Sequence, residues 1–428
     1  MGSIRRWINR DRARTSPIAS ITVPFFHPDA RTPAVNLTAR SIWLICTTSG
    51  LWAFSFGLGS QVVTHWLKAQ DVSDTVVGLS HSFYYFGLAA ASCGVPALTR
   101  RFGPTACATF GMIFAGVTLA AFPWAGGEWG WYLCRFLNGV AGALSLVPLE
   151  TIVSRDSVPH KKTQNFAYYG VSLTLGGALG IGLGLSTFQP GETSAFYLGA
   201  VLPIVAGLAL AVFLPTRAAT DAPGQRVPLG LRRNFLSFGT AWCQGFIEGG
   251  MLAFLSLFLV SRGFSADMAG MLMGVMMVGV ILFQVPVSWL ADRHGKTPIL
   301  LCCYAVVALG LLGIPWLTGS LWLALALFCF GACTGAMYPL GLSRLSDNMP
   351  ESGLARAYAW YLAIECVGSQ AGAAIMGKAR DLWGESAMFG VSLAAVLLVL
   401  AIWWMVRSPL SVAESPIVMC CKPQSTNH

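Results

Sequence analysis

Charged side chains are scarce in this sequence. Asp, Glu, Lys and Arg make up 11% of the 428 residues and hydrophobic residues make up 55%, whereas soluble domains carry about 25% charged residues. A soluble chain of this length would form about two or three domains, and so few charges would not cover their surfaces. The high apolar fraction and the lack of a Gly-X-Y period also exclude a disordered or collagen-like chain. The composition predicts a protein that crosses a membrane many times.

Motifs of nucleotide hydrolysis and of common metal sites are lacking as well. The sequence has no Walker loop, no C-x-x-C and no H-E-x-x-H, so neither ATP-driven chemistry nor a zinc or redox site is indicated. Most of the twelve cysteines lie in apolar runs, where a thiol is expected to be a small buried residue. We expect a protein that is not an enzyme and needs no cofactor, and the sequence identifies no metal ligands.

Twelve apolar segments are long enough to cross a bilayer as helices, which takes roughly 20 residues each. Gly- and Pro-rich junctions separate them, and the alternating pattern of a membrane β-barrel is not seen. The sequence therefore predicts an all-α membrane protein. The predicted spans are Ile42–Leu67, Val76–Leu98, Thr105–Trp124, Trp131–Val153, Phe166–Phe188, Phe196–Leu214, Phe235–Val260, Met268–Leu290, Pro298–Leu317, Leu321–Leu342, Ala355–Met376 and Ala387–Val406.

The Lys and Arg residues are distributed unevenly between the two sides of these spans. With the N-terminus inside, 22 of the 27 fall in inner segments, 4 in outer segments, and Arg135 within a span. Lys and Arg collect on the cytoplasmic side of membrane proteins, so both termini are predicted to be cytoplasmic in a bacterial cytoplasmic membrane. The formal charge of +9 then follows from this orientation, and no nucleic-acid partner is indicated.

The chain repeats itself at a fixed offset of 192 residues. Leu98, Arg101 and Gly103 align with Leu290, Arg293 and Gly295, and Gly139 and Gly180 align with Gly331 and Gly372. Such a repeat predicts two pseudo-symmetric six-helix halves, an arrangement common in transporters. The predicted organisation is a basic cytoplasmic extension (1–40), an N-terminal half (41–214), a cytoplasmic connector (215–234), a C-terminal half (235–407) and a cytoplasmic tail (408–428).

A loop motif gives this architecture a family resemblance. The segment 289–296, which contains Asp292, Arg293 and Gly295, is similar to the loop motif of the major facilitator superfamily between spans 8 and 9. Its counterpart between spans 2 and 3 contains Arg100, Arg101 and Gly103, with Arg100 where the family has an acid. Arg135 with Gly139, and the Gly-rich fifth span, resemble two further motifs. The resemblance covers about residues 40–408.

This resemblance implies a transporter in which two halves rock around a central site and open it to each side in turn. It implies that spans 1, 4, 7 and 10 line the site and that spans 3, 6, 9 and 12 face lipid. The predicted spans 3, 6, 9 and 12 contain no charged residue, as this requires. The loop at Asp292, Arg293 and Gly295 would help to close the inner side, whereas the matching N-terminal latch lacks its acid.

Charges within the spans are the first candidates for a transport site. Each costs at least about 2.5–3.5 kcal/mol at the bilayer centre, so it tends to face a cavity or a partner. Glu248 and Glu365 lie near the middle of spans 7 and 11. Desolvation favours the protonated form of a buried carboxylic acid, which suits proton coupling. Hydrogen-bonded structural carboxylates are the alternative.

Other polar groups offer further candidates. Arg135 and Glu150 share span 4, about 22 Å apart at 1.5 Å per residue, with side chains 60° apart around the helix. Arg135 would hold an anion or stabilise an ionised Glu, and Glu150 either faces the site or pairs with Arg155. His81, Gln244 and Tyr338 are candidates to line the pathway. The methionines of span 8 predict adaptable packing, with a soft-metal site as the alternative.

We predict a secondary transporter that is proton-coupled. The chain length, the basic extension and the Cys420-Cys421 tail are similar to those of magnetosome-associated facilitators, a resemblance that implies iron as the substrate for magnetite formation and a magnetosome membrane as the location. Carboxylates and imidazole are suitable iron ligands. The alternatives are a small organic solute or drug as the substrate, and a sensor or scaffold that does not transport. The basic extension is suited to anionic lipid or a protein partner.

Overall fold

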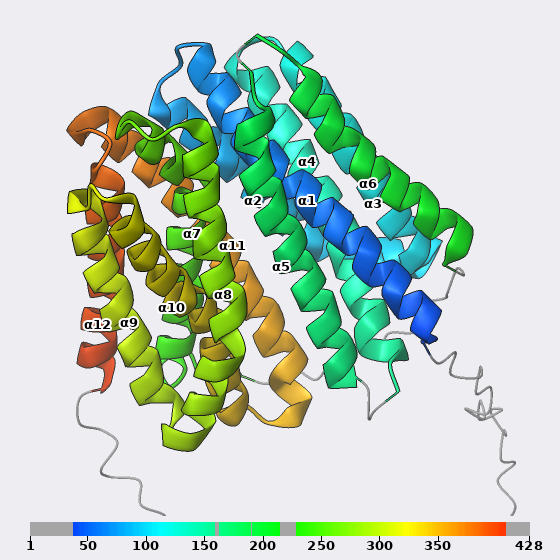
Figure 1. Cartoon of the computed structure of the whole chain (residues 1–428). Helices are drawn as coiled ribbons and strands as arrows, with labels where there is room; N and C mark the ends of the chain where they lie inside the picture. Colours follow the sequence, from blue (N-terminus) through cyan, green and yellow to red (C-terminus); the bar gives the residue numbers. More distant parts are fainter. Residues whose placement is uncertain (1–36, 159–161, 190, 215–227, 408–428) are drawn as a thin grey trace, which may run out of the picture. The chain divides into compact units, whose positions relative to one another are not determined.

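The computed structural model describes residues 37–158, 162–189, 191–214 and 228–407. These ranges contain helices and no strand (Figure 1). The α-helices are α1 Ala39–Ala69, α2 Asp74–Phe102, α3 Pro104–Ala121, α4 Gly127–Asp156, α5 Lys162–Thr187, α6 Ser194–Phe213, α7 Phe235–Ser261, α8 Ala266–His294, α9 Lys296–Gly313, α10 Ser320–Asp347, α11 Glu351–Trp383 and α12 Ala387–Arg407, with short 3-10 helices η1 Phe122–Trp124 and η3 Ile314–Trp316. Nearly all of the predicted extension, most of the connector and the tail lie outside the described residues.

The twelve helices confirm the predicted fold class, and most of them extend beyond the predicted spans. Helix α11 has 33 residues, about 50 Å at 1.5 Å per residue, whereas the hydrocarbon layer is about 30 Å thick. Ten helices of the described residues are long and apolar enough to cross a membrane by length and composition. Helices α2 and α11 fall short of that measure, and they pack against each other between the halves.

The helix bounds repeat at the predicted offset. Helices α8 and α9 begin and end 192 residues after α2 and α3. Gly103 and Gly295 join these pairs with φ of 84° and 95°, a left-handed conformation that glycine adopts without the steric cost of a Cβ. Each glycine ends one helix and begins the next, so the repeat in the sequence marks the same sharp turn in both halves.

Glycines also bring helices together at equivalent places in the two halves. A Cβ on Gly139 of α4 would lie 1.9 Å from the Tyr84 carbonyl oxygen of α2, and one on Gly331 of α10 would lie 2.1 Å from that of Met276 in α8. Small residues allow such close approach in membrane bundles. The aligned glycines are therefore explained by helix packing within each half.

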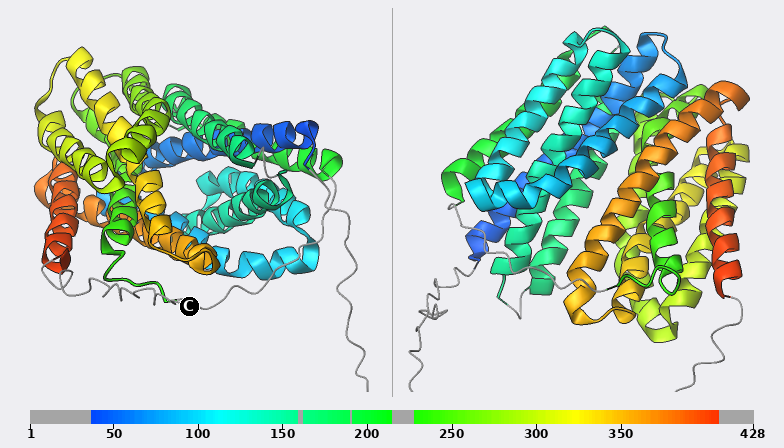
Figure 2. Two further views of the ribbon diagram at one scale, coloured as in Figure 1. Left: turned by 90° about the horizontal axis from the view of Figure 1, so that it is seen from below. Right: turned by 180° about the vertical axis from the view of Figure 1, so that it is seen from behind.

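Helices α1–α6 gather on one side of the bundle and α7–α12 on the other (Figures 1 and 2). We call the end at which α1 begins the inner end and the opposite end the outer end, after the predicted orientation. Across the two halves, α2 packs along α11 and α5 along α8. The halves meet near the outer end and separate toward the inner end (Figure 1).

Candidate functional site

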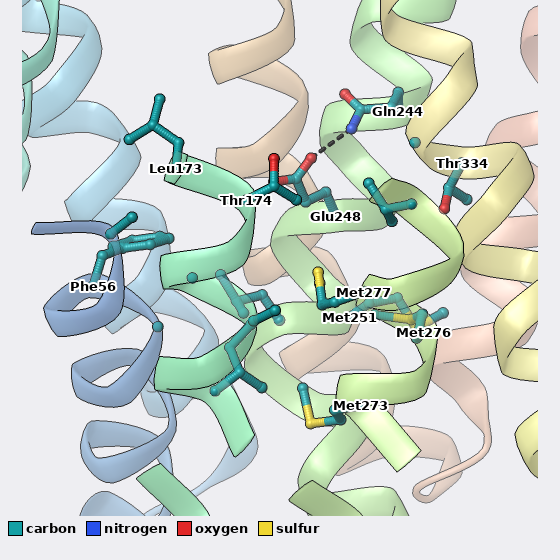
Figure 3. A pocket seen from close by; sticks show the side chains of 18 of the residues that line it. Phe56, Leu173, Thr174, Gln244, Glu248, Met251, Met273, Met276, Met277 and Thr334 are labelled. Atoms are coloured by element: carbon teal, nitrogen blue, oxygen red, sulfur yellow. Dashed lines mark hydrogen bonds between the residues drawn. The ribbon is translucent and has the colours of Figure 1, made fainter. Parts of the chain in front are cut away.

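A cavity of about 430 Å³ lies between the two halves. Side chains of α1, α2, α4, α5, α7, α8, α10 and α11 line it, and Figure 3 shows part of this lining. The family resemblance implies α1, α4, α7 and α10, so the structure adds α2, α5, α8 and α11. No described residue of α3, α6, α9 or α12 is part of the lining. The size is within the range of small-molecule sites, about 300–1,000 Å³.

Two carboxylic acids line this cavity, one from each of two C-terminal-half helices. Glu248 of α7 faces the open space, and Glu365 of α11 is half-buried. The Gln244 side-chain amide, one turn before Glu248 on α7, donates a hydrogen bond to its carboxylate (Figure 3). The Gln244 amide oxygen is buried and has no hydrogen-bond partner among the described residues. The acids thus face a common space with an unused acceptor beside them.

Arg135 lies behind the cavity wall. Its side chain is buried, and the guanidinium lies 4.9 Å from the ring centroid of Tyr84, which lines the cavity. Among the described residues Arg135 pairs with no carboxylate. Its Nη2 is instead 3.4 Å from Nδ1 of His81. No direct contact among the described residues therefore supports the predicted role of Arg135 as a partner of an ionised Glu.

His81 links Arg135 to the interface between the halves. Its Nε2 is 2.9 Å from the Thr64 hydroxyl, which donates to the Ala253 carbonyl oxygen of α7 at 3.4 Å. Because the hydroxyl proton is used there, the hydroxyl accepts from Nε2–H of a neutral His81, and Nδ1 accepts from Arg135. His81 is buried and is not part of the cavity lining, so the structure places it beside the predicted pathway.

The remaining candidates on the spans lie apart from the two acids. Glu150 is exposed near the inner end of α4 and is not part of the cavity lining, while the side chain of Arg155 lies outside the described residues. Tyr338 of α10 is half-buried, its ring centroid lies 5.0 Å from that of Tyr361, and its carbonyl oxygen accepts a hydrogen bond from the Tyr361 hydroxyl. Of the three predicted pathway residues, only Gln244 lines the cavity.

The two motif loops lie at the inner end. Asp292 and Arg293 are exposed, and the Arg293 guanidinium lies 5.3 Å from the centroid of Trp289 in its own helix. Next to them Lys296 forms an ion pair with Asp347 of α10 at 2.7 Å, a contact within the C-terminal half. In the N-terminal loop Arg100 and Arg101 are exposed. The gating role of these loops stays a prediction.

At the outer end, side chains of α1 hydrogen-bond across to α7. Gln61 donates to the Leu252 carbonyl oxygen at 3.1 Å, and Thr64 bonds to that of Ala253. One turn after Gln61, His65 lies 3.2 Å from the Ser256 hydroxyl. Residues 61, 64 and 65 occupy one face of α1 because they are three and four apart. This face closes the cavity on its outer side.

Ionic contacts join α2 to α11 at the same end. Arg380 Nε lies 2.9 Å from Oδ2 of Asp74, and their side chains are 2% and 10% exposed. Lys68 Nζ forms a further ion pair with Oδ1 of Asp74, at 2.8 Å. This contact is not aligned as a hydrogen bond, and Oδ1 has no hydrogen-bond partner among the described residues. Sequence reasoning counted Lys68 and Arg380 only as outer charges. Only four of the 27 Lys and Arg residues are predicted on the outer side, and this rarity could have marked them as candidates for ion pairs.

Asp381 adds a helix cap across the halves. Its carboxylate accepts from the backbone amides of Asp74 and Thr75, at 2.9 and 2.8 Å, and from the Thr75 hydroxyl. It lies beyond the predicted span. Partial burial raises its pKa, but the bonds from Thr75 and the two amides outweigh this and hold the pKa below its usual value. A carboxylate at a helix N-terminus is stabilising. We call the contacts of residues 61–75 with residues 252–256 and 380–381 the outer seam.

All hydrogen bonds and ion pairs described between the halves lie on the outer side of Glu248 and Glu365. The cavity is thus closed at one end by specific pairs, while the helices separate at the other end (Figure 1). Two pseudo-symmetric helical halves around a membrane-embedded cavity define a transporter of the facilitator class. Comparison with family models agrees with this class.

The chain belongs to the Major Facilitator Superfamily. The family model matches residues 44–267 and 237–417, most of the chain. This chain is 23% identical over 327 residues to the uncharacterized MFS-type transporter YfkF of Bacillus subtilis (strain 168), and the match covers 72% of this chain and 79% of the relative. It is 25% identical over 376 residues to the uncharacterized MFS-type transporter YE1530 of Yersinia enterocolitica, covering 84% and 94%.

Solved structures share the fold. A mutant form of the nucleoside transporter NupG superposes with a TM-score of 0.70 at 14% identity, covering 86% of this chain and 99% of that one. A D-xylose-proton symporter gives 0.69 at 14% identity, covering 85% and 97%. A bacterial homolog of the human lysosomal transporter Spinster, inward-facing and unoccupied, gives 0.68 at 14% identity, covering 88% and 97%. At these identities the likeness concerns the fold alone.

Proposed function

We propose that this protein carries a small organic solute across the membrane by alternating access, coupled to protons through Glu248 and Glu365. The observation that carries the proposal is the position of the two acids: both face one cavity between the halves, and the described hydrogen bonds and ion pairs between the halves all lie on its outer side. With the predicted orientation, the structure corresponds to an inward-facing state. The outward-facing state forms when the outer seam separates and the inner ends approach.

The acids supply a physical reason for coupling. In the open state water reaches Glu248, which accommodates a charged carboxylate. Closing both ends would leave two carboxylates in a low-dielectric space, and an unpaired buried charge is costly. Protonation or a bound cation removes this cost. The halves therefore pass through the closed state only when the acids are loaded, which ties solute movement to proton movement.

Two neighbours of the same fold support a small organic substrate. One is named a nucleoside transporter and one a D-xylose-proton symporter, and these names describe those proteins. In this chain the cavity wall is mostly apolar and aromatic, with few polar groups. Such a lining is typical of sites for small organic molecules.

Iron delivered to a magnetosome compartment is the second candidate. The similarity of the chain ends supports it, together with the carboxylates of the cavity, which suit iron. The described residues contain no group of three or more His, Cys, Asp or Glu side chains that could hold a metal ion. We therefore place the organic solute first and retain iron as one arm of the test. A sensor or scaffold would move none of the solutes, which distinguishes it from a transporter.

The test is flux in proteoliposomes with a pH-sensitive dye inside. Candidate solutes (organic cations, nucleosides, sugars, short peptides, and radiolabelled ferrous and ferric iron) are added with and without an imposed pH gradient. We expect saturable solute-dependent proton movement, lost in Glu248→Gln and Glu365→Gln. Glu128→Gln is the matched control, because Glu128 is exposed at the outer start of α4. Folded protein that moves no solute in any arm would contradict the proposal.

A further inference from the structure

We propose that the solute is an organic cation with an apolar body, held between Glu248 and Glu365 and the aromatic and thioether walls of the cavity. This rests on the proposed transport function and names its substrate class. The first argument is charge. Among the described residues that line the cavity, these two acids are the only charged ones. A site whose charged groups are all carboxylates favours a positive ligand.

The nearest buried cation is kept away from the solute. Arg135 belongs to a second, very small pocket of about 10 Å³. The ring of Tyr84 stands between its guanidinium and the large cavity, in contact with both. The other face of Arg135 bonds to His81. Arg135 is not part of the large cavity's lining, so an anionic solute would find no cavity-facing cation among the described residues.

The N-terminal half contributes an aromatic wall. The rings of Trp52 and Phe56 are stacked with centroids 5.8 Å apart, and Phe56 lies 5.0 Å from Tyr84. All three line the cavity. The faces of Trp, Tyr and Phe attract cations within about 6 Å, and the attraction is larger where water is excluded. This wall faces the same space as the two carboxylates.

The C-terminal half contributes thioethers. Met251 of α7 and Met273, Met276 and Met277 of α8 line the same cavity as Glu248 (Figure 3). Methionine is flexible and polarisable, so it adapts to irregular apolar surfaces. A hard or hydrated metal ion would gain little from walls of this kind, whereas an organic cation would fill them. A volume of about 430 Å³ admits such a molecule.

One polar group fits a nitrogen-bearing cation. The Gln244 amide oxygen is unpartnered in the described structure, and the side chain is 8% exposed. Its amide nitrogen already bonds to Glu248. An N–H of a bound ammonium would satisfy this oxygen, because an unmade buried acceptor is costly. The site then offers this unpartnered acceptor and two acids on a surface that is otherwise mostly apolar.

The test uses two ions that share one shape and differ in charge. Tetraphenylphosphonium and tetraphenylborate are offered to the purified full chain in nanodiscs at pH 8, and binding is measured by equilibrium dialysis. We expect the cation to bind at least tenfold more tightly than the anion. That preference should be lost in Glu248→Gln/Glu365→Gln and kept in Glu128→Gln. Equal binding, preference for the anion, or no binding of either ion would overturn the proposal.

Two further arms guard against ambiguity. If the double variant does not fold, lowering the pH of the wild type from 8 to 5 replaces it, since protons and the cation compete for the same acids; cation affinity should fall and anion affinity should not. Displacement of the phosphonium ion by Ag⁺ at equimolar concentration would favour a thioether metal site and overturn the organic-cation assignment. Failure of the transport proposal looks different: the cation binds with acid dependence, yet no solute drives proton flux.

Discussion

The two interfaces between the halves occupy equivalent places in the repeat, yet they are built differently. At α2 and α11, a Cβ on Gly78 would lie 2.2 Å from the Ala373 carbonyl oxygen, and at α5 and α8 one on Gly270 would lie 2.8 Å from that of Gly182. Gly270 stands 192 residues after Gly78. Both interfaces thus rely on glycine for close helix approach.

Among the described residues, only the interface of α2 and α11 adds an ion pair. The offset of 192 places Ala266 opposite Asp74 and Phe188 opposite Arg380, so the buried ion pair has no counterpart between α5 and α8. Glycine contacts allow helices to meet, and the ion pair adds a strong and specific bond that must be broken for the halves to part. We therefore expect the interface of α2 and α11 to control the opening of the outer seam, whereas the interface of α5 and α8 contributes close packing.

The largest effect is expected when this ion pair loses one partner. In Asp74→Asn the buried guanidinium of Arg380 keeps its charge without a carboxylate, and removal of one member of a buried pair costs about 3–5 kcal/mol. The closed outer seam should become the minor state. Spin-label distances between Gln70 and Arg262, both at the outer end, should lengthen, and solute uptake should fall. Asp74→Asn/Arg380→Gln should recover part of the closed population; no recovery would argue against pairing as the cause.

The glycine contacts should give the second-largest effect. Gly78→Ala places a methyl group against backbone, and overpacking of this kind costs about 1–3 kcal/mol. Gly270→Ala meets a less severe contact and should shift the same outer distances less. Gly94→Ala and Gly274→Ala are controls, because a Cβ there meets nothing within 4 Å. Equal shifts in all four variants would contradict the assignment of these glycines to the seam.

A smaller effect is expected from the hydrogen bonds of α1. Thr64→Val keeps the shape of the side chain and removes both the bond to the Ala253 carbonyl oxygen and the acceptor for His81. A typical hydrogen bond contributes about 0.5–1.5 kcal/mol, so the ratio of closed to open protein should fall by roughly 2- to 13-fold for each bond lost. The Gln70–Arg262 distance distribution measures this. A variant indistinguishable from the wild type would remove Thr64 from the seam.

The smallest effect concerns the cap from Asp381 and its dependence on pH. Its pKa is below the usual value in the closed state and returns toward about 3.9 when the seam opens. Its contribution to closure is therefore fully present above about pH 4 and is lost as pH falls through the lowered value. The difference in closed population between Asp381→Asn and the wild type should therefore stay constant from pH 5 to 8. A closed population of this variant that changes relative to wild type within that range would contradict the account.

Much of the fold was predictable from the sequence. The length of the apolar segments predicted the helices. The pairs Gly139 with Gly331 and Gly103 with Gly295 indicated the repeat, because each of these positions requires glycine for close helix packing or for a positive φ. Glu248 and Glu365 stood out because an acid within an apolar run requires a cavity or a partner. These inferences depend on features that lie within a single helix or turn.

The pairs that close the outer seam were not predictable in the same way. Asp74 and Arg380 are 306 residues apart, and each sits at a helix end where an exposed charge is ordinary. The contact of Arg135 with His81 likewise joins different helices. The contribution of α2, α5, α8 and α11 to the cavity lining was not predicted. It depends on the angle between the two halves, which the sequence of a single span does not determine.

The central claim is that the two ends of the molecule open in alternation under control of Glu248 and Glu365. The most direct test is pulsed spin-label distance measurement in nanodiscs, on a background without native cysteines, for an outer pair (Gln70 and Arg262) and an inner pair (Phe102 and His294). Both pairs are exposed and related by the offset of 192. Neutralising the acids with Glu248→Gln/Glu365→Gln should populate short inner distances, because a state with both ends closed no longer buries two unpaired charges. Long outer distances should then appear in the same sample as the halves pass on to the outward-facing state. Inner distances that stay long in the double variant would contradict the account.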